Sequence, residues 1–506
     1  MIIEDQSDVI AWLARQSKQP NAPDTERIET HISEIFLTGD RAYKLKRAVK
    51  LPYADFSTPQ IRLRACEKEL ALNVATSPEI YIRVRRITQD GTGLVFDGSG
   101  ELVDSVVEMH RFEQKRILDQ MALDGQLTSD IMSVLAREIA VSHGNSPLVQ
   151  QDGVANIENI LDINRAGFGQ SDVFSETEIE HIDQRFRAGL QILAPIVTQR
   201  ADRGCIKRCH GDLHLRNICM FNGRPQLFDC IDFNDELATV DVLYDLAFLA
   251  MDLWHRSMTE LASLVVNQYL DQSNEEDGYA CFPYFIALRA AVRAHVLATQ
   301  AQDATSDEAA EKIREARSYH DLALSLLEPQ QARLIAIGGL SGSGKSTVAT
   351  KIAPLVGPAP GARMIESDRT RKAMFNVEAE SCLPESAYTQ EVSDKVYAMM
   401  AARAADLLAT GCSVVADAVF NVPDRRRMME DTATQARVPF DGIWLQADPD
   451  ILRHRVKTRP KTASDATANI LRMQLSHDPG SVSWKSITTA GSVENTISET
   501  RRLLGL

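Results

Sequence analysis

The chain has 506 residues, more than one hydrophobic core usually supports, so we expect two or three domains. Its formal net charge of −15 disfavours broad, non-specific binding to nucleic acid or anionic lipid. No run approaches the roughly 18 apolar residues of a membrane span, and residues 1–5 lack the basic start of a signal peptide. We therefore expect a cytoplasmic protein with no membrane partner.

Eight cysteines are scattered along the chain without any CxxC pair. Four of them lie around His210, but their spacing does not fit a zinc site. We expect reduced thiols in the core, since cysteine is a common buried residue.

The pattern of the first 325 residues predicts a small antiparallel sheet followed by a mainly helical region. A short helix begins the chain, and Thr38-Gly39-Asp40 is a hairpin signal between two strand-like runs. The expected strands are 32–37, 41–46 and 103–109, and a helix is expected over 58–74. Helical patterning covers about 112–325, interrupted by 208–233.

A different pattern begins after Pro329, where we place a domain boundary. Apolar strands then alternate with helical stretches, which is typical of a parallel α/β sheet. The expected strands are 334–337, 363–367, 413–418 and 442–446. The predicted domains are thus residues 1–328 and 329–506.

A complete Walker A loop follows the first of these strands and opens a helix, as this motif requires. Its glycines let backbone N–H groups close around phosphate oxygens, while Lys345 reaches the β- and γ-phosphates and Ser346 binds Mg²⁺. The predicted nucleotide-binding residues are Gly339, Leu340, Ser341, Gly342, Ser343, Gly344, Lys345, Ser346 and Thr347. The alternative is a glycine-rich turn that binds nothing.

Carboxylates end the next two predicted strands of this region. Asp368 can accept a proton from an acceptor hydroxyl, and Arg371 can hold an anion. A helix-capping aspartate with a solvated arginine is the structural alternative. Asp417 ends the following strand and is suited to Mg²⁺ or its water ligands, as in a Walker B strand.

Arginines are frequent in the rest of this region. The run 425–427 follows the Asp417 strand, and Arg453, Arg455 and Arg459 occupy a basic helical stretch. Such a stretch can form a lid over the phosphates or a solvated helix face.

Together these motifs resemble the P-loop small kinases, namely the group of gluconate kinase, zeta toxin and polynucleotide kinase. The resemblance covers about residues 333–500. It implies that Asp368 is the base that activates the acceptor and that Arg371 contacts acceptor or phosphate. The motifs do not encode the acceptor.

A second, unrelated signature lies upstream. In His210-Gly211-Asp212 with Asn217, the spacing lets a loop present Asp212 to a hydroxyl while Asn217 reaches a metal ion on ATP. The expected strand 226–233 carries Asp229 and Asp232. Their odd offset places them on different faces, so only one can bind metal, and we favour Asp232.

These residues resemble the aminoglycoside phosphotransferase and choline kinase family, a branch of the protein-kinase-like fold. The shared pattern is H-G-D-x-x-x-x-N, then I-D-F, then the D-L-A of Asp245 to Ala247. The resemblance covers about residues 25–325, and it implies an α+β bilobal domain in which Asp245 is a structural buttress. The expected fold class is therefore such a domain followed by a C-terminal α/β P-loop domain.

This family also needs a strand lysine for the phosphates and a helix glutamate that orients it. Lys44 and Lys46 share a strand face, and Glu67 and Glu69 compete for the partner role; we favour Lys46 and Glu69. An edge-strand lysine that only guards against aggregation is the alternative.

Two further phosphate- and base-binding features are expected from the same resemblance. The sequence lacks G-x-G-x-x-G, so residues 30–33 are the candidate phosphate-covering turn. The segment 107–109, ending at Met109, is placed where an interlobe hinge would contact adenine.

The leading hypothesis is a bifunctional kinase that uses ATP and Mg²⁺ in both domains and phosphorylates small hydroxylated molecules. One alternative is a single kinase whose other domain is a nucleotide-binding regulator. Another is a C-terminal nucleotide or RNA kinase, which the scarcity of basic runs disfavours. The acceptor pocket of the first domain is expected in helices over 255–320, where Arg289, Arg293 and His295 can face an anion or lie on a solvated face.

Overall fold

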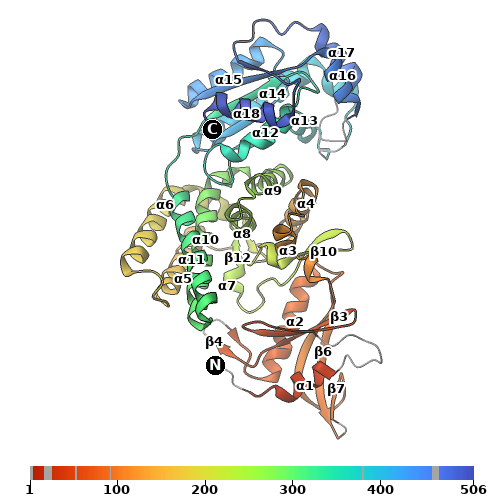
Figure 1. Cartoon of the computed structure of the whole chain (residues 1–506), viewed down its shortest axis with the longest axis vertical. Coiled ribbons are helices and arrows are strands. Elements are labelled where there is room, and N and C mark those ends of the chain that lie inside the picture. Colours follow the sequence, from red (N-terminus) through yellow and green to blue (C-terminus); the bar gives the residue numbers. More distant parts are fainter. Residues whose placement is uncertain (1–3, 16–25, 52–53, 92, 379–380, 459–466) are drawn as a thin grey trace. The chain divides into compact units, whose positions relative to one another are not determined.

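The computed structural model describes residues 4–15, 26–51, 54–91, 93–378, 381–458 and 467–506 (Figure 1). The chain forms two compact units. The first unit comprises residues 1–156 and 198–252, and the second comprises 157–197 and 253–506. Each unit is thus built from segments that are separated in the sequence.

The first unit contains a six-stranded antiparallel sheet, which confirms the predicted hairpin and the strand near residue 103. In spatial order its strands are β1 (Glu26–Glu29), β2 (Ser33–Thr38), β3 (Arg41–Lys46), β8 (Glu101–His110), β6 (Tyr81–Asp90) and β7 (Gly93–Phe96). The sequence pattern did not reveal β6 and β7. The first of them carries three arginines, which obscure the apolar alternation of a half-buried strand.

Helices cover both faces of this sheet. Helix α1 (Ser7–Arg15) packs with Phe36 and Leu45 on one face, and α2 (Pro59–Val74) packs with Leu37 and Ala42 on the other. The predicted helix over 58–74 is confirmed, and the Thr58 side chain caps its N-terminus. Since side chains alternate across a strand, Lys44 and Lys46 face α2 together with Ala42.

The remaining elements of the first unit are short strands and helices that carry the His210 loop. They are β4 (Lys50–Leu51), β5 (Ala54–Asp55), η1 (Gln114–Arg116), α3 (Leu118–Leu123), α4 (Ser129–Asn145), β9 (Ile206–Arg208), η2 (Leu215–Asn217), β10 (Ile218–Phe221), β11 (Arg224–Leu227), α7 (Asp235–Ala238) and β12 (Thr239–Asp241).

The predicted strand over 226–233 is wrong in its extent, because β11 ends at Leu227. Asp229 has a φ of 60°, a left-handed conformation that interrupts a strand. Asp229 and Asp232 therefore lie in a loop, and the alternation of strand faces does not separate them.

Helices make up most of the chain over 153–202 and 242–326. Most of this helical part belongs to the second unit, but α8 (Val242–His255) lies almost entirely in the first. The other elements are α5 (Gly153–Phe168), α6 (Glu176–Asp202), α9 (Thr259–Gln272), α10 (Phe282–Gln300), α11 (Ser306–Leu326) and the short 3-10 helices η3 (Glu276–Cys281) and η4 (Ala301–Asp303). The mainly helical pattern predicted for this region is confirmed.

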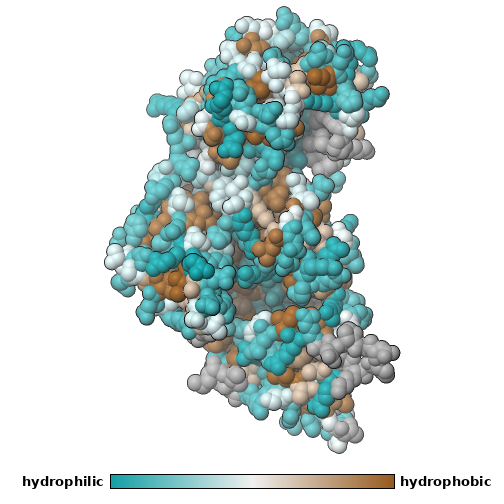
Figure 2. Space-filling model, viewed as in Figure 1, coloured by the Kyte–Doolittle hydropathy of each residue, from teal (hydrophilic) through white to brown (hydrophobic). Residues whose placement is uncertain are grey.

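One segment of this helical part, residues 276–300, has the length and hydropathy of a membrane span. Most of it is buried inside the protein, as in the core helix of a folded domain. On the face drawn in Figure 2, hydrophobic side chains lie in several separate groups among hydrophilic ones.

The second unit also contains a five-stranded parallel sheet, which confirms the predicted C-terminal α/β fold. Its strand order is β14 (Arg363–Glu366), β15 (Val414–Asp417), β13 (Leu334–Gly339), β16 (Phe440–Gln446) and β17 (Lys485–Thr488). All six residues of β13 are buried, as expected for the central strand of a sheet covered on both faces. The short β17 was missed, since Lys485–Thr488 has only one buried residue.

Helices lie on both sides of this parallel sheet (Figure 1). Helix α12 (Lys345–Ile352) packs against α18 (Val493–Leu504), while α14 (Gln390–Ala409) packs against α15 (Pro423–Ala436). The other elements are η5 (Ala353–Leu355), α13 (Ser367–Met374), η6 (Glu385–Tyr388), α16 (Pro449–Thr458) and α17 (Ala468–Ser476).

The open edge of the sheet, strand β14, is bonded by a side chain of α9. The Asn267 Oδ1 accepts a hydrogen bond of 2.8 Å from the Met364 N–H, and its Nδ2 donates to the Ala362 carbonyl at 3.5 Å. The amide thus replaces the peptide group of a neighbouring strand. Two backbone groups that this edge would otherwise leave unpaired, the Met364 N–H and the Ala362 carbonyl, are satisfied.

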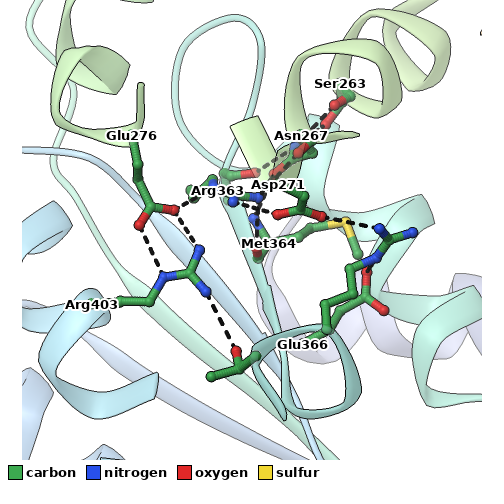
Figure 3. Close-up of polar contacts among 11 residues, drawn as sticks. Ser263, Asn267, Asp271, Glu276, Arg363, Met364, Glu366 and Arg403 are labelled. Carbon is green, nitrogen blue, oxygen red and sulfur yellow. Dashed lines mark hydrogen bonds and ion pairs between the residues drawn. The ribbon is translucent and has the colours of Figure 1, made fainter. Parts of the chain in front are cut away.

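Beside this contact, the fully buried Arg363 is surrounded by acceptors from α9 and η3 (Figure 3). Its guanidinium binds Asp271 at 2.5 Å and Glu276 at 2.7 Å. Arg403 of α14 also binds Glu276, at 2.6 Å. Although burial opposes its charge, Arg363 and Arg403 lower the pKa of Glu276 to about 2.

This ion cluster makes the stability of the second unit depend on pH. A glutamate with a depressed pKa stabilises the fold above its ordinary value of 4.5, and this contribution is lost as the pH falls toward about 2. We expect Glu276→Gln to lower stability at pH 7, by on the order of 2–3 kcal/mol. The difference in melting temperature from the wild type should narrow below pH 4.5 in thermal unfolding curves.

The matched control is Glu391→Gln, which removes an exposed glutamate paired with Lys395 on α14. Exposed pairs of this kind contribute little, so its melting temperature should stay close to that of the wild type. If the melting temperature of Glu276→Gln stayed below that of the wild type by the same amount from pH 7 to pH 3.5, the depressed pKa of Glu276 would be contradicted.

Candidate functional sites

In the first unit, the buried carboxylate of Asp245 holds the His210 loop through a hydrogen bond to its backbone. Gly211 has a φ of 83°, and a Cβ there would lie 3.0 Å from both Ile231 and Ala238, so only glycine fits. Its N–H donates to Asp245 Oδ1 at 2.8 Å, and His143 Nε2 lies 3.2 Å from the other oxygen. Asp245 is fully buried on α8, in the position that a buttress of the loop would occupy.

The loop brings Asp212 and Asn217 together. The Asn217 side-chain amide donates to Asp212 Oδ2 at 2.8 Å and to the Asp212 carbonyl at 2.9 Å. The Asp212 carboxylate remains 40% exposed, so it can reach an acceptor hydroxyl. Asn217 is the last residue of η2, and its side chain is hydrogen-bonded to Asp212, with which the sequence motif pairs it.

Both candidate lysines meet one glutamate. Lys44 lies 2.8 Å from Glu69 Oε1, and Lys46 lies 2.6 Å from Glu69 Oε2. Glu69 is fully buried, whereas Glu67 is exposed on the same helix. Burial works against the carboxylate, but Lys44 and Lys46 lower the pKa of Glu69 to about 2.

The two loop aspartates each bind a different lysine. Asp229 pairs with Lys44, and Asp232 Oδ2 lies 2.6 Å from Lys46 Nζ. The Asp229 side chain is 46% exposed, while that of Asp232 is 5% exposed. Burial raises the pKa of Asp232, which indicates an interior position. The accessible carboxylate is therefore Asp229, although the sequence favoured Asp232.

The residues here suit a magnesium ion. Asp229 offers an accessible carboxylate, and the adjoining Phe228 N–H bonds to the Asn217 carbonyl at 3.0 Å, so the two candidate ligands come from neighbouring segments. Oxygen ligands of this kind are the ones that Mg²⁺ prefers. Asp232 as the metal ligand stays a prediction.

The other predicted nucleotide contacts lie at the ends of the sheet. Residues 30–32 form the turn between β1 and β2, where the Thr30 hydroxyl bonds to the Ser33 carbonyl at 2.9 Å. Met109 is the penultimate residue of β8, opposite Ala42 and Tyr81, and the chain leaves the sheet after His110. Its role at adenine stays a prediction.

Glu69, which forms ion pairs with both Lys44 and Lys46, provides a test of the first centre. Glu69→Gln would leave two buried ammonium groups short of a carboxylate, and breaking such a pair costs on the order of 3–5 kcal/mol. We expect lower thermal stability and loss of nucleotide binding by this centre, measured by titration calorimetry in a Lys345→Ala background. Glu67→Gln, two residues away on the exposed face, is the matched control and should bind as before.

In the second unit, the Walker loop follows β13 as predicted. Gly339 has a φ of 140°, and a Cβ there would lie 2.3 Å from the Leu445 carbonyl oxygen. Gly344 is left-handed at the N-terminus of α12, which begins at Lys345. Among the described residues, the buried Ser343 hydroxyl has no hydrogen-bond partner. The loop thus has the backbone geometry and a spare hydroxyl for phosphate oxygens.

The predicted metal-binding pair of this loop is assembled. Asp417 ends β15 beside β13. Burial raises the pKa of Asp417, opposed by the nearby Lys345 and by the nearby Ser346 side chain, which also acts to lower it. A hydroxyl and a carboxylate at a phosphate loop suit Mg²⁺.

A cavity of about 740 Å³ opens beside the loop. Of the predicted residues, Lys345, Ser346, Asp368, Arg371 and Asp417 line it together. The Arg371 Nη1 donates to the Ala387 carbonyl at 2.7 Å, its guanidinium lies over the Tyr388 ring, and its buried Nε has no hydrogen-bond partner among the described residues. Burial lowers the pKa of Arg371. The alternative of a solvated arginine is excluded by this position.

The other arginines of this unit have distinct places. Arg425 and Arg455 line the cavity, whereas Arg426 is buried and donates to the Phe420 carbonyl at 2.8 Å. Arg453 is exposed and pairs with Asp450, and Arg459 falls outside the described residues. The α17 residue Gln474 accepts a hydrogen bond of 2.9 Å from the Ser341 N–H, so this helix covers the loop.

Sequence reasoning missed several cavity residues. Tyr388, Gln390, Ser393 and Tyr397 come from η6 and α14 and belong to no motif with fixed spacing. The α9 residues that line the same cavity also belong to no such motif; they are Ser263, Leu264, Asn267, Gln268 and Asp271. In the helical part, His295 is buried 3.2 Å from Asn164, and burial lowers its pKa to about 4.

The cysteines are free thiols, and all except Cys382 are buried. Cys209, His143 and Asp245 bring potential metal-ligating atoms within 4.8 Å of one another. Each has a hydrogen bond that explains its position, as the Cys209 thiol donates to the Val240 carbonyl at 3.6 Å and the other two support Gly211.

Comparison with known proteins supports the P-loop assignment. Residues 334–479 match the family model described as AAA domain. Proteins of Mycobacterium tuberculosis and Mycobacterium bovis, named only as uncharacterized, are each 29% identical over 486 residues, with 93% of both chains covered. The predicted C-terminal P-loop domain is therefore confirmed, and the two-part chain has relatives of the same extent.

Solved structures similar to parts of the chain include members of both resembled families. A gluconokinase from Sinorhizobium meliloti is 22% identical and covers 35% of this chain and 94% of its own, with a TM-score of 0.26. A choline/ethanolamine kinase family protein from Mesorhizobium loti is 13% identical and covers 63% of this chain and 98% of its own, with a TM-score of 0.38.

Proposed function

We propose that the protein is a bifunctional ATP-dependent phosphotransferase with one centre in each unit. The observation that carries this proposal is that each unit holds its own lysine, its own exposed or cavity-lining aspartate, and its own oxygen ligands for a metal. The acceptors are small hydroxylated molecules rather than nucleic acid.

In the first centre, Asp212 accepts the proton of the acceptor hydroxyl, and Asn217 keeps its carboxylate in place. We assign the phosphate contact to Lys44, since its partner Asp229 is the accessible one of the two aspartates. Lys46 and Asp232 form the inner pair that keeps Glu69 fixed. Mg²⁺ held by Asp229 and Asn217 would neutralise phosphate charge.

In the second centre, the loop amides and Lys345 bind the phosphates, and Asp368 accepts the acceptor proton. Ser346 and Asp417 would hold Mg²⁺, which supplies charge neutralisation there too. Arg371 lies in the same cavity, where its unpaired Nε can bind an acceptor anion or the transferred group.

The experiment is an ATP-dependent consumption screen of a cell-extract metabolite pool with three proteins, namely wild type, Asp212→Ala and Lys345→Ala. We expect two sets of consumed metabolites, one lost in each variant by roughly a hundredfold or more in rate. Mass spectrometry of the pool provides the measurement, and chelation of Mg²⁺ with EDTA should stop both reactions.

The outcomes separate the hypotheses. If both variants lose the same single activity, the two-reaction proposal fails. If Asp212→Ala changes no metabolite while the first unit still binds ATP, the first unit is a nucleotide-binding regulator instead.

A further inference from the structure

Helix α9 lies in the sequence range that resembles the choline kinase family, yet it packs on the P-loop part of the second unit. It contacts α12 and η5, and its side chains line the cavity beside the Walker loop. Strand β14, which leads directly to Asp368, is bonded along its edge by Asn267 of this helix.

We propose that α9 is a wall of the acceptor site of the P-loop centre. In this wall, Gln268 contacts the acceptor, and Asp271 is a positioning residue for the β14–α13 junction that carries Asp368. The inference rests on the proposed kinase function of this centre and names residues that none of its motifs contains.

The positioning role follows from a chain of ion pairs that starts at Asp271. One carboxylate oxygen binds Arg363 at the start of β14, at 2.5 Å. The other lies 3.4 Å from Arg369 of α13, whose Nε donates to Glu366 at 3.2 Å. Both ends of β14 and the first turn of α13 are thus tied to one side chain of α9.

These ties lie where small displacements matter. Glu366 and Asp368 flank Ser367, the first residue of α13, and both line the cavity. Asp271 has 15% of its side chain exposed and lines the same cavity, so it reaches the site directly. A shift of about 1 Å in a catalytic group is enough to reduce a rate by a hundredfold.

The contact role of Gln268 follows from its place in the wall. Gln268 lies one turn before Asp271 on α9 and lines the cavity together with Ser263. Gln390, Ser393 and Arg425 line the same cavity and offer further polar groups. Hydroxyl and anionic groups of a small acceptor would find hydrogen-bonding partners among these side chains.

The test uses full-length variants in an Asp212→Ala background, with the same metabolite extract as the acceptor probe, serially diluted. The half-saturating dilution then stands for KM, and mant-ATP fluorescence reports nucleotide affinity. Gln268→Ala should raise the half-saturating extract concentration by about threefold to tenfold with little change in maximal rate. Asp271→Asn should lower the maximal rate about tenfold or more, with mant-ATP affinity unchanged within about twofold.

Two further variants separate positioning from general stability. Asp271→Glu keeps the charge and should recover most of the rate. Glu260→Gln removes another ion pair between α9 and the P-loop part, with Lys351 at 2.6 Å, but outside the cavity lining. It should leave both kinetic parameters at the level of the background protein.

Hydrogen exchange gives a measurement that needs no turnover. Asp271→Asn should speed exchange of the amides over 364–372 while β13 keeps its protection, and Glu260→Gln should do neither. Unchanged exchange at 364–372, or unchanged kinetics in both cavity variants, overturns the inference. If the parent protein showed no Lys345-dependent consumption of any metabolite, the proposed function would fail instead. The exchange result would still show whether Asp271 of α9 holds the β14–α13 junction in place.

Discussion

A buried cation must be matched by carboxylates, and this constraint organises both units of the protein. Taking a guanidinium or ammonium out of water costs several kcal/mol unless acceptors surround it. Arg363 is fully buried, and its carboxylate partners are Asp271 and Glu276. These residues lie 92 and 87 positions earlier in the chain, so one buried charge fixes a long-range arrangement.

The same constraint acts in the first unit, with a different consequence. Lys44 and Lys46 are both buried on one face of β3, so each needs an anionic partner. Glu69 serves both, while Asp229 and Asp232 each complete one pair. The pairs differ in exposure, and this difference distinguishes an outer site that a ligand can reach from an inner one that supports it.

The motifs with a fixed local spacing were predictable from sequence, since they are properties of one loop. The Walker loop and the His210 loop bring their own residues together, and the hairpin of β2 and β3 follows from its turn. The choice between Asp229 and Asp232 was not predictable by alternation, because the left-handed Asp229 lies outside any strand. The wall formed by α9 was also hidden, as Asn267 and Asp271 act on residues more than 90 positions away.

Motif boundaries and physical boundaries therefore answer different questions in this chain. The sequence pattern changes near Pro329, where the strand-helix alternation begins, and that boundary stays a prediction. Contacts instead group α9, α10 and α11 with the parallel sheet in one unit. Residues 329–506 without α9 would leave the β14 edge without the hydrogen bond to Asn267. They would also leave the buried Arg363 without its ion pair to Asp271. Helix α9, which precedes the Walker loop in the sequence, thus completes the hydrogen bonding and the charge balance at the β14 edge of the sheet.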